Sequence, residues 1–194
     1  MTPNQHPIIN DISKHLILDP QEIETICASF HVHHYNRKSI IVDQGQRLDQ
    51  LYYVAKGLIK LEYTDRQGKE HILGFALENW WETDLGAFFY QQETSLRLIT
   101  MEKTLVYGLS KSDYDQLLLK HPRLHLYFLE KSVGGAYAAQ QRILSLLSMD
   151  STNRYQQLLQ LYPEWFQRIP KTSLAKYLGV SRETLSRMLI KNTP

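Results

Sequence analysis

The stretch that decides the architecture of the C-terminal part is IPKTSLAKYLGVSRETLSRMLIK, residues 169–191. It holds two short segments with apolar residues at helical spacing, separated by Gly179. The apolar residues fall on the sides that would face each other: Leu174, Leu178, Leu185, Met188 and Leu189. Ala175 is small where two helices would cross, and Ser181 stands where it can cap the second helix. This pattern is typical of a helix-turn-helix, whose second helix enters the major groove of DNA.

The predicted second helix carries a polar face opposite its apolar one. Arg182 and Ser186 are four residues apart, as are Glu183 and Arg187, so all four share this face. Arginine can donate two hydrogen bonds to guanine, and a carboxylate can accept one from the amino group of cytosine. We therefore expect Arg182, Glu183 and Arg187 to read base edges, with Ser186 assisting. The alternative is a solvated face with a Glu183–Arg187 ion pair worth about 0.2–0.5 kcal/mol.

The charge of the chain is concentrated at its C-terminal end. The net charge is only +2, but residues 171–194 hold 5 Lys/Arg against 1 Asp/Glu, which gives +4. Residues 1–110 hold 10 Lys/Arg against 14 Asp/Glu, which gives −4. A basic end is expected where phosphates are bound. The side chains that we expect to contact the DNA backbone rather than the bases are Lys171, Thr172, Ser181, Thr184 and Lys191.

A resemblance follows from these residues. VSRETLSRML, residues 180–189, resembles the recognition helix of the cAMP receptor/FNR superfamily of bacterial transcription regulators, whose hallmark is Ser-Arg-Glu-Thr followed after two residues by Arg. Upstream, FHVHHYNRKSIIVDQGQRLDQLYYVAKGLIKL, residues 30–61, is similar to the first strands of that family's β-roll, with the Gly45 turn and a strand ending at Gly57. The resemblance extends from about Ile23 to Leu189.

The resemblance implies an α+β fold: a β-roll sensor domain of the cyclic-nucleotide-binding type with an N-terminal helix (1–110), a dimerisation segment (111–149) and a helix-turn-helix domain (150–194). It implies a homodimer that binds double-stranded DNA at a pseudo-palindrome of TGTGA-like half-sites about 10–10.5 bp apart. It also implies RNA polymerase as a further partner. The family usually continues into a small β wing, which is not expected here because the chain stops at Pro194.

The residues themselves predict the same division. Short β-rich runs are Ser39–Val42, Leu51–Val54, Gly57–Tyr63, His71–Ala76, Ser95–Thr100 and Thr104–Leu109. Asp65–Gly68 between two of them reads as a hairpin turn. Such spacing favours a sandwich or roll over a doubly wound sheet. Upstream, we expect a helix over Pro20–Phe30 and a short apolar turn at His15–Leu18.

The helical part begins with a predicted helix at Ser112–His121 and continues with a long one at Arg123–Met149. The long helix carries a coiled-coil-like seam: Leu126, Leu129, Val133, Ala136, Gln140, Ile143 and Leu147. Gly134 and Gly135 weaken its middle by about 1 kcal/mol each relative to Ala, which close approach of a partner could offset. The resemblance favours a parallel homodimer, in which Gln140 could fix the register, and the alternative is a helix that lies on its own roll. Asp150–Thr152 then reads as a hinge and cap before a helix at Asn153–Leu161.

The effector site of the cAMP-binding family members is altered here. Their Gly-Glu and Arg-Ser pairs align with Thr83-Asp84 and Thr94-Ser95. Gly86 and Ser95 are kept, Asp84 stands in place of the glutamate, and Thr94 replaces the arginine that pairs with the cyclic phosphate. Arg97 lies two residues out of register, and Ala139-Gln140 replaces the adenine-contacting Thr-Ser. Burying a phosphate without its arginine leaves its charge poorly compensated. We therefore expect no cAMP dependence and no cofactor; an unknown effector remains open.

Aromatic residues crowd the same segment, and they are Trp80, Trp81, Phe88, Phe89 and Tyr90. They read either as ordinary core or as a filling of the vacated nucleotide pocket.

Other classes of protein fit less well. His31, His33 and His34 could suggest a metal site of a cupin-like metalloenzyme, but the companion ligands lack the required spacing, so neither a metal nor an enzyme is expected. The single Cys27 fits a reducing cytoplasm and excludes a cysteine-ligated iron–sulfur cluster within one chain. No stretch approaches the roughly 20 apolar residues of a membrane span. A sensor whose helix-turn-helix contacts proteins rather than DNA remains the main alternative.

Overall fold

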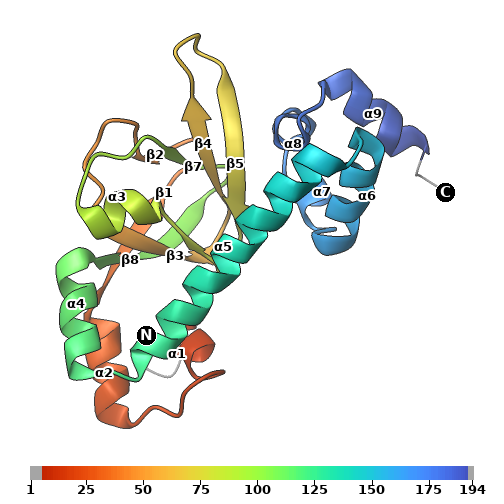
Figure 1. The fold of residues 1–194 in the computed structure, drawn as a ribbon. Helices are drawn as coiled ribbons and strands as arrows, with labels where there is room; N and C mark the ends of the chain where they lie inside the picture. Colours follow the sequence, from red (N-terminus) through yellow and green to blue (C-terminus); the bar gives the residue numbers. More distant parts are fainter. Residues whose placement is uncertain (1–5, 192–194) are drawn as a thin grey trace. The chain divides into compact units, whose positions relative to one another are not determined.

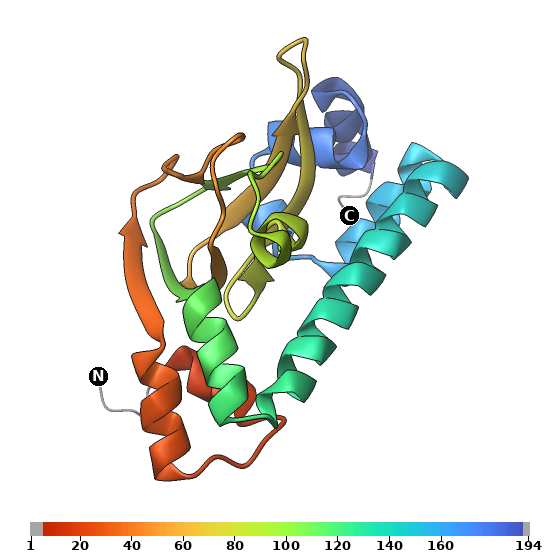
Figure 2. The ribbon, with the colours of Figure 1, turned by 60° about the vertical axis from the view of Figure 1, so that its left-hand side comes forward.

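The computed structural model describes residues 6–191, which fold as two compact units (Figures 1 and 2). The first unit comprises Met1–Tyr63 and Gly74–Ser132, and the second comprises Thr64–Leu73 and Val133–Pro194. The tip of one β-hairpin therefore belongs to the same unit as the C-terminal helices.

The strands in the described residues form two four-stranded sheets, with the orders β1-β8-β3-β6 and β2-β7-β4-β5. Their bounds are β1 (Phe30–Tyr35), β2 (Ile40–Val42), β3 (Gln50–Lys56), β4 (Ile59–Thr64), β5 (Glu70–Ala76), β6 (Trp81–Glu82), β7 (Arg97–Thr100) and β8 (Thr104–Ser110). Strands that are distant in sequence pair within each sheet, and the three pairs of the first sheet are antiparallel. The chain therefore crosses between two packed sheets, as in a jelly roll. This confirms the predicted α+β class.

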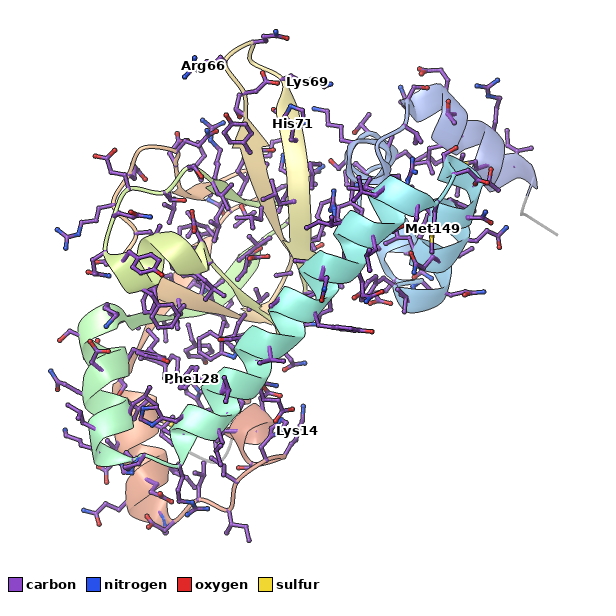
Figure 3. The ribbon with its side chains drawn as sticks, viewed as in Figure 1. Lys14, Arg66, Lys69, His71, Phe128 and Met149 are labelled. Atoms are coloured by element: carbon purple, nitrogen blue, oxygen red, sulfur yellow. The ribbon has the colours of Figure 1, made fainter. Side chains whose placement is uncertain are left out.

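Two apolar clusters hold the first unit together. One lies between the two sheets, because alternate residues of each strand point to the same face; its members include Tyr52, Val54, Val106, Ile59, Leu61 and Leu98. The other covers the outer face of the first sheet with helices and includes Ile8, Ile26, Tyr53, Leu109, Leu117 and Tyr127. Phe128 lies on the side of α5 that faces α4 (Figure 3), and its ring centroid is 5.0 Å from that of Tyr114.

The helices of the first unit are α1 (Pro7–Ile12), α2 (Pro20–Ala28), α3 (Leu85–Tyr90), α4 (Lys111–Lys120) and the first part of α5 (Leu124–Ser148). Three of them, α2, α3 and α4, begin at a side chain that caps them. Asp19 and Glu22 form a reciprocal capping box at α2, and Ser110 accepts a hydrogen bond from the Asp113 amide at α4. Because these signals are local, the predicted helices at Pro20–Phe30 and Ser112–His121 are nearly right.

Several short elements were not predicted. The apolar turn expected at His15–Leu18 lies slightly earlier, at Ser13–His15 directly after α1, and Leu16 and Leu18 pack partly buried against the core. The main apolar anchor of this region is α1, whose Ile8 and Ile12 are completely buried. At six residues, α1 is too short for a clear helical period. The sequence-based list of strands also missed β1 and β6, and the list of helices missed α3 and α7 (Trp165–Arg168).

The second unit contains the rest of α5, then α6 (Ser151–Leu161), α7, α8 (Lys171–Leu178) and α9 (Arg182–Lys191). Asp150 caps α6 by accepting a hydrogen bond of 2.9 Å from the Asn153 amide, as predicted. The buried side chains that hold these helices together are Tyr155, Leu158, Trp165, Ile169, Leu174, Ala175, Leu178 and Leu185. Within residues 6–191, no helix has the length and apolar character that a membrane crossing needs.

Candidate nucleic-acid interface

The turn between α8 and α9 depends on a glycine. Gly179 ends α8 with a φ of 70°, in the left-handed region, and its amide donates to the carbonyls of Ala175 and Lys176. The Val180 amide then donates to the Ala175 carbonyl at 3.0 Å. A residue with a side chain is strained at such a φ, so the glycine lets the chain reverse over a short distance. The predicted helix-turn-helix is therefore present in the structure.

The two helices pack through the residues that the sequence pattern predicts. Leu174, Leu178 and Leu185 are buried, and Ala175 is buried where the helices meet. The apolar residues nearer the end of α9, Met188 and Leu189, are half-buried. This packing fixes which face of α9 is turned to solvent.

The start of α9 is held by a hydroxyl pair. Ser181 Oγ accepts a hydrogen bond from the Thr184 amide at 3.1 Å, as an N-cap should, and lies 3.1 Å from Thr184 Oγ1. Thr184 Oγ1 in turn accepts from Arg187 Nη2 at 3.5 Å. Both hydroxyls that we expect to contact phosphate are thus also part of the helix start.

The exposed face of α9 carries the predicted base-reading residues. Arg182, Glu183 and Arg187 are exposed, and Ser186 is half-buried. Hydrogen bonds from its own backbone amide and from Ser181 lower the pKa of Glu183, so this carboxylate is charged at neutral pH. Within the described residues Arg187 and Glu183 form no ion pair, so the guanidinium is oriented by Thr184 instead.

The flanking basic residues differ in their surroundings. Lys171 and Thr172 are exposed at the start of α8. Lys176 forms an ion pair of 2.6 Å with Glu70, near the hairpin tip where Figure 3 labels Arg66, Lys69 and His71. Lys191 is the last residue of α9, and its side chain lies outside what the structure describes.

Two arginines that the sequence analysis did not single out anchor this unit. Arg154 on α6 donates from Nε to the carbonyl of Leu178 at 3.1 Å and from Nη1 to the carbonyl of Met149 at 2.5 Å; Met149 is labelled at the end of α5 in Figure 3. It thereby satisfies carbonyls at the C-terminal ends of α8 and α5. Arg142 on α5 similarly donates to backbone carbonyls. No spacing rule reveals such pairs, because their acceptors are main-chain atoms.

The roll places Asp84 and Thr94 together. Asp84 caps α3, accepting from the Ala87 amide at 3.1 Å, and its other oxygen accepts from Thr94 Oγ1 at 2.8 Å. Thr94 is buried. The position of the missing phosphate-binding arginine is therefore occupied by a hydroxyl that already has a carboxylate partner.

The surroundings of the other residues of the expected effector site differ from one to the next. Arg97 donates from Nε to Asp43 Oδ1 at 2.5 Å, and Ser95 is exposed. Gly86 lies beside Asp84, whose Oδ1 would be 3.4 Å from a Cβ on this glycine. Ala139 and Gln140 are exposed on α5.

The aromatic residues of this segment divide into two groups. Trp81 and Phe88 belong to the core beneath the helices; Trp81 Nε1 donates to Tyr127 Oη at 2.9 Å. This confirms the interpretation as core for these two residues. Trp80, Phe89 and Tyr90 have large exposed fractions.

The histidines of β1 do not converge on a common site. His31 Nε2 lies 3.3 Å from Asp113 Oδ2, whereas His33 stacks beside Tyr35. Among residues 6–191, no three His, Cys, Asp or Glu side chains are grouped so as to hold a metal ion.

The predicted seam of α5 forms an exposed apolar stripe on the described chain. Val133 is 58% exposed and Ile143 57%, and the exposed fractions of Leu126, Leu129 and Leu147 are larger. At 100° per residue, Gly134 and Gly135 lie on the side of the helix opposite this stripe. Both glycines are exposed and a Cβ on either would meet no atom within 4 Å, so the close approach of a partner that was expected to offset them stays a prediction.

Comparison with known proteins supports a relation over most of the chain. Residues 32–121 match the family described as cyclic nucleotide-binding domain. The cAMP-activated global transcriptional regulator CRP of Salmonella typhimurium is 26% identical over 177 residues, which cover 86% of this chain and 84% of that protein. The cAMP-activated regulator Vfr of Pseudomonas aeruginosa is 24% identical over 183 residues, covering 87% and 85%.

Solved structures share the fold. The c-di-GMP responsive global regulator CLP of Xanthomonas campestris aligns with a TM-score of 0.72 at 21% identity, covering 89% of this chain and 91% of that one. FixK2 from Bradyrhizobium japonicum aligns with a TM-score of 0.71 at 16% identity, covering 84% and 83%. These likenesses extend beyond the roll into the helical part.

Proposed function

We propose that the chain is a transcription regulator of the CRP/FNR superfamily and that it binds DNA sequence-specifically as a homodimer; its similarity to the CRP proteins and to the solved structures above supports this proposal. The observation that carries the proposal is the orientation of α9. Its apolar side, with Leu185 completely buried, packs on α8, so Arg182, Glu183 and Arg187 are turned to solvent. A helix presented in this way can place two guanidinium groups and one carboxylate against base edges.

The phosphate contacts are assigned to residues around this helix. Lys171 and Thr172 are exposed at the start of α8, where amides and a cation can meet a phosphate. Ser181 is exposed at the start of α9 and is assigned the same role, with Thr184 and Lys191. These contacts position the helix without reading sequence.

The dimer is proposed from the stripe on α5. Five apolar side chains at heptad-like spacing are about 57% exposed or more: Leu126, Leu129, Val133, Ile143 and Leu147. A contiguous apolar stripe of this kind is a common feature of a helix that pairs with a copy of itself. Two copies related by a two-fold axis would read inverted half-sites.

We propose that this regulator does not respond to cAMP, unlike the CRP and Vfr proteins whose names describe them as cAMP-activated. Asp84 and Thr94 are hydrogen-bonded to each other, and Arg97 is paired with Asp43. None of these groups offers an unengaged cation to a cyclic phosphate. The charge of that phosphate would be buried without adequate compensation.

The experiment is fluorescence anisotropy with a labelled duplex that carries inverted TGTGA half-sites about 10–10.5 bp apart, and with a scrambled duplex. We expect tighter binding to the first duplex. Arg187→Ala should cost roughly 1–3 kcal/mol on the specific duplex and relax the preference at one G·C pair. Lys171→Ala is the matched control and should weaken binding to both duplexes alike, because it removes a phosphate contact.

Equal losses on both duplexes for Arg187→Ala would contradict its base-reading role. Absence of binding to this duplex, together with no protected stretch in footprints of the host's promoters, would overturn the proposal. The helix-turn-helix would then be a surface for protein contacts.

A further inference from the structure

A pocket of about 350 Å³ lies within the second unit, bounded by the second half of α5 and by α6 and α8. Its volume falls in the range of about 300–1,000 Å³ typical of small-molecule sites. Much of its wall is apolar, with Leu146, Leu158 and Leu161. Tyrosines 162 and 177 add aromatic rings with polar ends. Such a wall suits a ligand with an aliphatic or aromatic body.

The charged side chains that line the pocket are both arginines, Arg142 and Arg154, and none of the described lining residues is acidic. Within residues 6–191, neither arginine forms an ion pair with a carboxylate. The pocket therefore carries two positive charges without a counterion. A cation withdrawn from water without a partner is costly, so an anion bound here would gain more than at a solvated surface.

Arg142 is held in a fixed orientation. It donates from Nη1 to the Leu73 carbonyl at 2.7 Å and from Nη2 to the carbonyls of Ile72 at 2.7 Å and Tyr177 at 3.1 Å. Its guanidinium carbon lies 3.6 Å from the centroid of the Tyr177 ring. Burial lowers the pKa of Arg142, which reflects the loss of water around its charge. Carbonyl dipoles stabilise this cation but leave its net charge uncompensated.

Arg154 retains donors that the protein does not use. Its Nε and Nη1 donate to the carbonyls of Leu178 and Met149. Its Nη2 takes part in none of the hydrogen bonds among the described residues. An arginine has five N–H groups in a planar fork. The side chain is thus positioned by two bonds and can still donate to a ligand.

From the unneutralised arginine pair and the apolar walls, we propose that this pocket is a binding site for a small organic anion, a carboxylate, sulfonate or phosphate on an aromatic or aliphatic body. Arg154 binds the anionic group through Nη2, and Arg142 supports it with its positive charge. The leucines and the tyrosine rings contact the body of the ligand. Because α8 is part of the predicted helix-turn-helix and forms one wall of the pocket with α6, a bound ligand would change the affinity of the protein for DNA. This effect on DNA affinity rests on the proposed function, whereas the binding of the ligand does not.

The test uses two fluorescent probes with the same aromatic body: 8-anilinonaphthalene-1-sulfonate, which is anionic, and N-phenyl-1-naphthylamine, which is neutral. Each is titrated into the full-length protein at a concentration where sedimentation defines its oligomeric state. We expect saturable binding of the sulfonate at one molecule per chain and at least about tenfold weaker binding of the neutral probe, the effect of one charge-assisted hydrogen bond.

Variants locate the binding. Arg154→Gln should weaken the sulfonate about tenfold and leave the neutral probe unchanged. Arg66→Gln, the same substitution at an exposed arginine of the hairpin tip in the same unit, is the matched control and should change neither. Leu161→Trp, at a partly exposed wall position, fills the pocket while keeping both arginines, and should weaken both probes. Thermal unfolding of each variant checks that it folds.

Equal affinity for the two probes would overturn the proposal, as would sulfonate binding that is insensitive to Leu161→Trp. No saturable binding of the sulfonate would show that the pocket is closed, for example by side chains of a second copy, and would also overturn it. None of these results depends on DNA binding, so the failure of this inference and the failure of the proposed function can be told apart.

Discussion

The guanidinium of Arg142 lies over the ring of Tyr177, with 3.6 Å between its central carbon and the ring centroid. The same guanidinium donates to the main-chain carbonyl of Tyr177 at 3.1 Å. One side chain of α5 therefore holds both the ring and the backbone of α8, the first helix of the helix-turn-helix. With its bonds to Ile72 and Leu73, it also ties the hairpin tip into the same unit.

We predict that Arg142→Lys lowers the free energy of unfolding by about 2–4 kcal/mol, because lysine cannot reproduce three carbonyl bonds from one planar fork and stacks less well. Urea denaturation followed by circular dichroism measures the change. Tyr177→Phe is the control: it keeps the aromatic face over which the cation lies, so its effect should be under about 1 kcal/mol.

A similar loss for Tyr177→Phe would contradict the role assigned to the stacked pair and would point to the tyrosine hydroxyl instead. An unchanged unfolding midpoint for Arg142→Lys would mean that a single ammonium suffices at this site.

The parts of the fold that the sequence predicts are those that short-range rules determine. The effects of Gly179, Ser181 and Leu185 depend on neighbours within a few residues, so the turn, the cap and the packed face of α9 can be predicted from the sequence. The long helix can also be predicted, because the apolar residues of its seam repeat along one face.

The remaining features depend on residues that are distant in sequence. Arg154 binds the carbonyl of Leu178, 24 residues away, and a main-chain acceptor leaves no trace in the sequence. The Asp84–Thr94 hydrogen bond depends on how α3 and the following loop are placed. The arginine pair of the pocket is visible only once α5 and α6 are folded. The candidate DNA-reading face was thus predictable, and the candidate ligand site was not.

Glu82 provides a pH-dependent contribution to stability. Burial raises its pKa to about 7, although the Thr83 amide donates a hydrogen bond of 3.1 Å to its Oε1. The ordinary value is 4.5, so between these two values the folded state binds more protons than the unfolded state. The contribution of Glu82 to the free energy of unfolding therefore falls as the pH rises from about 4.5 to about 7, and it is constant above that range.

We predict that Glu82→Gln removes this dependence. The variant should gain stability relative to the natural chain on going from pH 5 to pH 8, by up to about 3 kcal/mol. Urea titrations of both proteins at several pH values give the difference, and the comparison cancels the histidines, which titrate in both. Parallel curves for the two proteins would show that the Glu82 carboxyl ionises as it does in water.

The Asp84–Thr94 pair predicts the response to cyclic nucleotide. Titration of the purified protein with cAMP in a calorimeter should give no saturable heat at micromolar concentrations, because Thr94 provides no positive charge for the phosphate. The CRP protein of Escherichia coli, a relative of 26% identity described as cAMP-activated, is the positive control under the same conditions. Saturable heat at one molecule per chain would contradict the prediction, and another cation of this chain would then have to replace the missing arginine.

The stripe on α5 predicts where the proposed dimer is sensitive to substitution. Val133, which is 58% exposed, lies at the centre of the stripe, so Val133→Asp would bury a carboxylate between two helices and should convert the dimer to monomers at micromolar concentration. Gly134→Ala, one residue further on, is the control: a Cβ there meets no atom within 4 Å, and the position faces away from the stripe. This control should leave the dimer intact and raise the free energy of unfolding by about 0.8–1 kcal/mol through helix propensity. Sedimentation equilibrium separates the two outcomes, and a dimer that survives Val133→Asp but is lost in Gly134→Ala would place the interface on the opposite side of the helix.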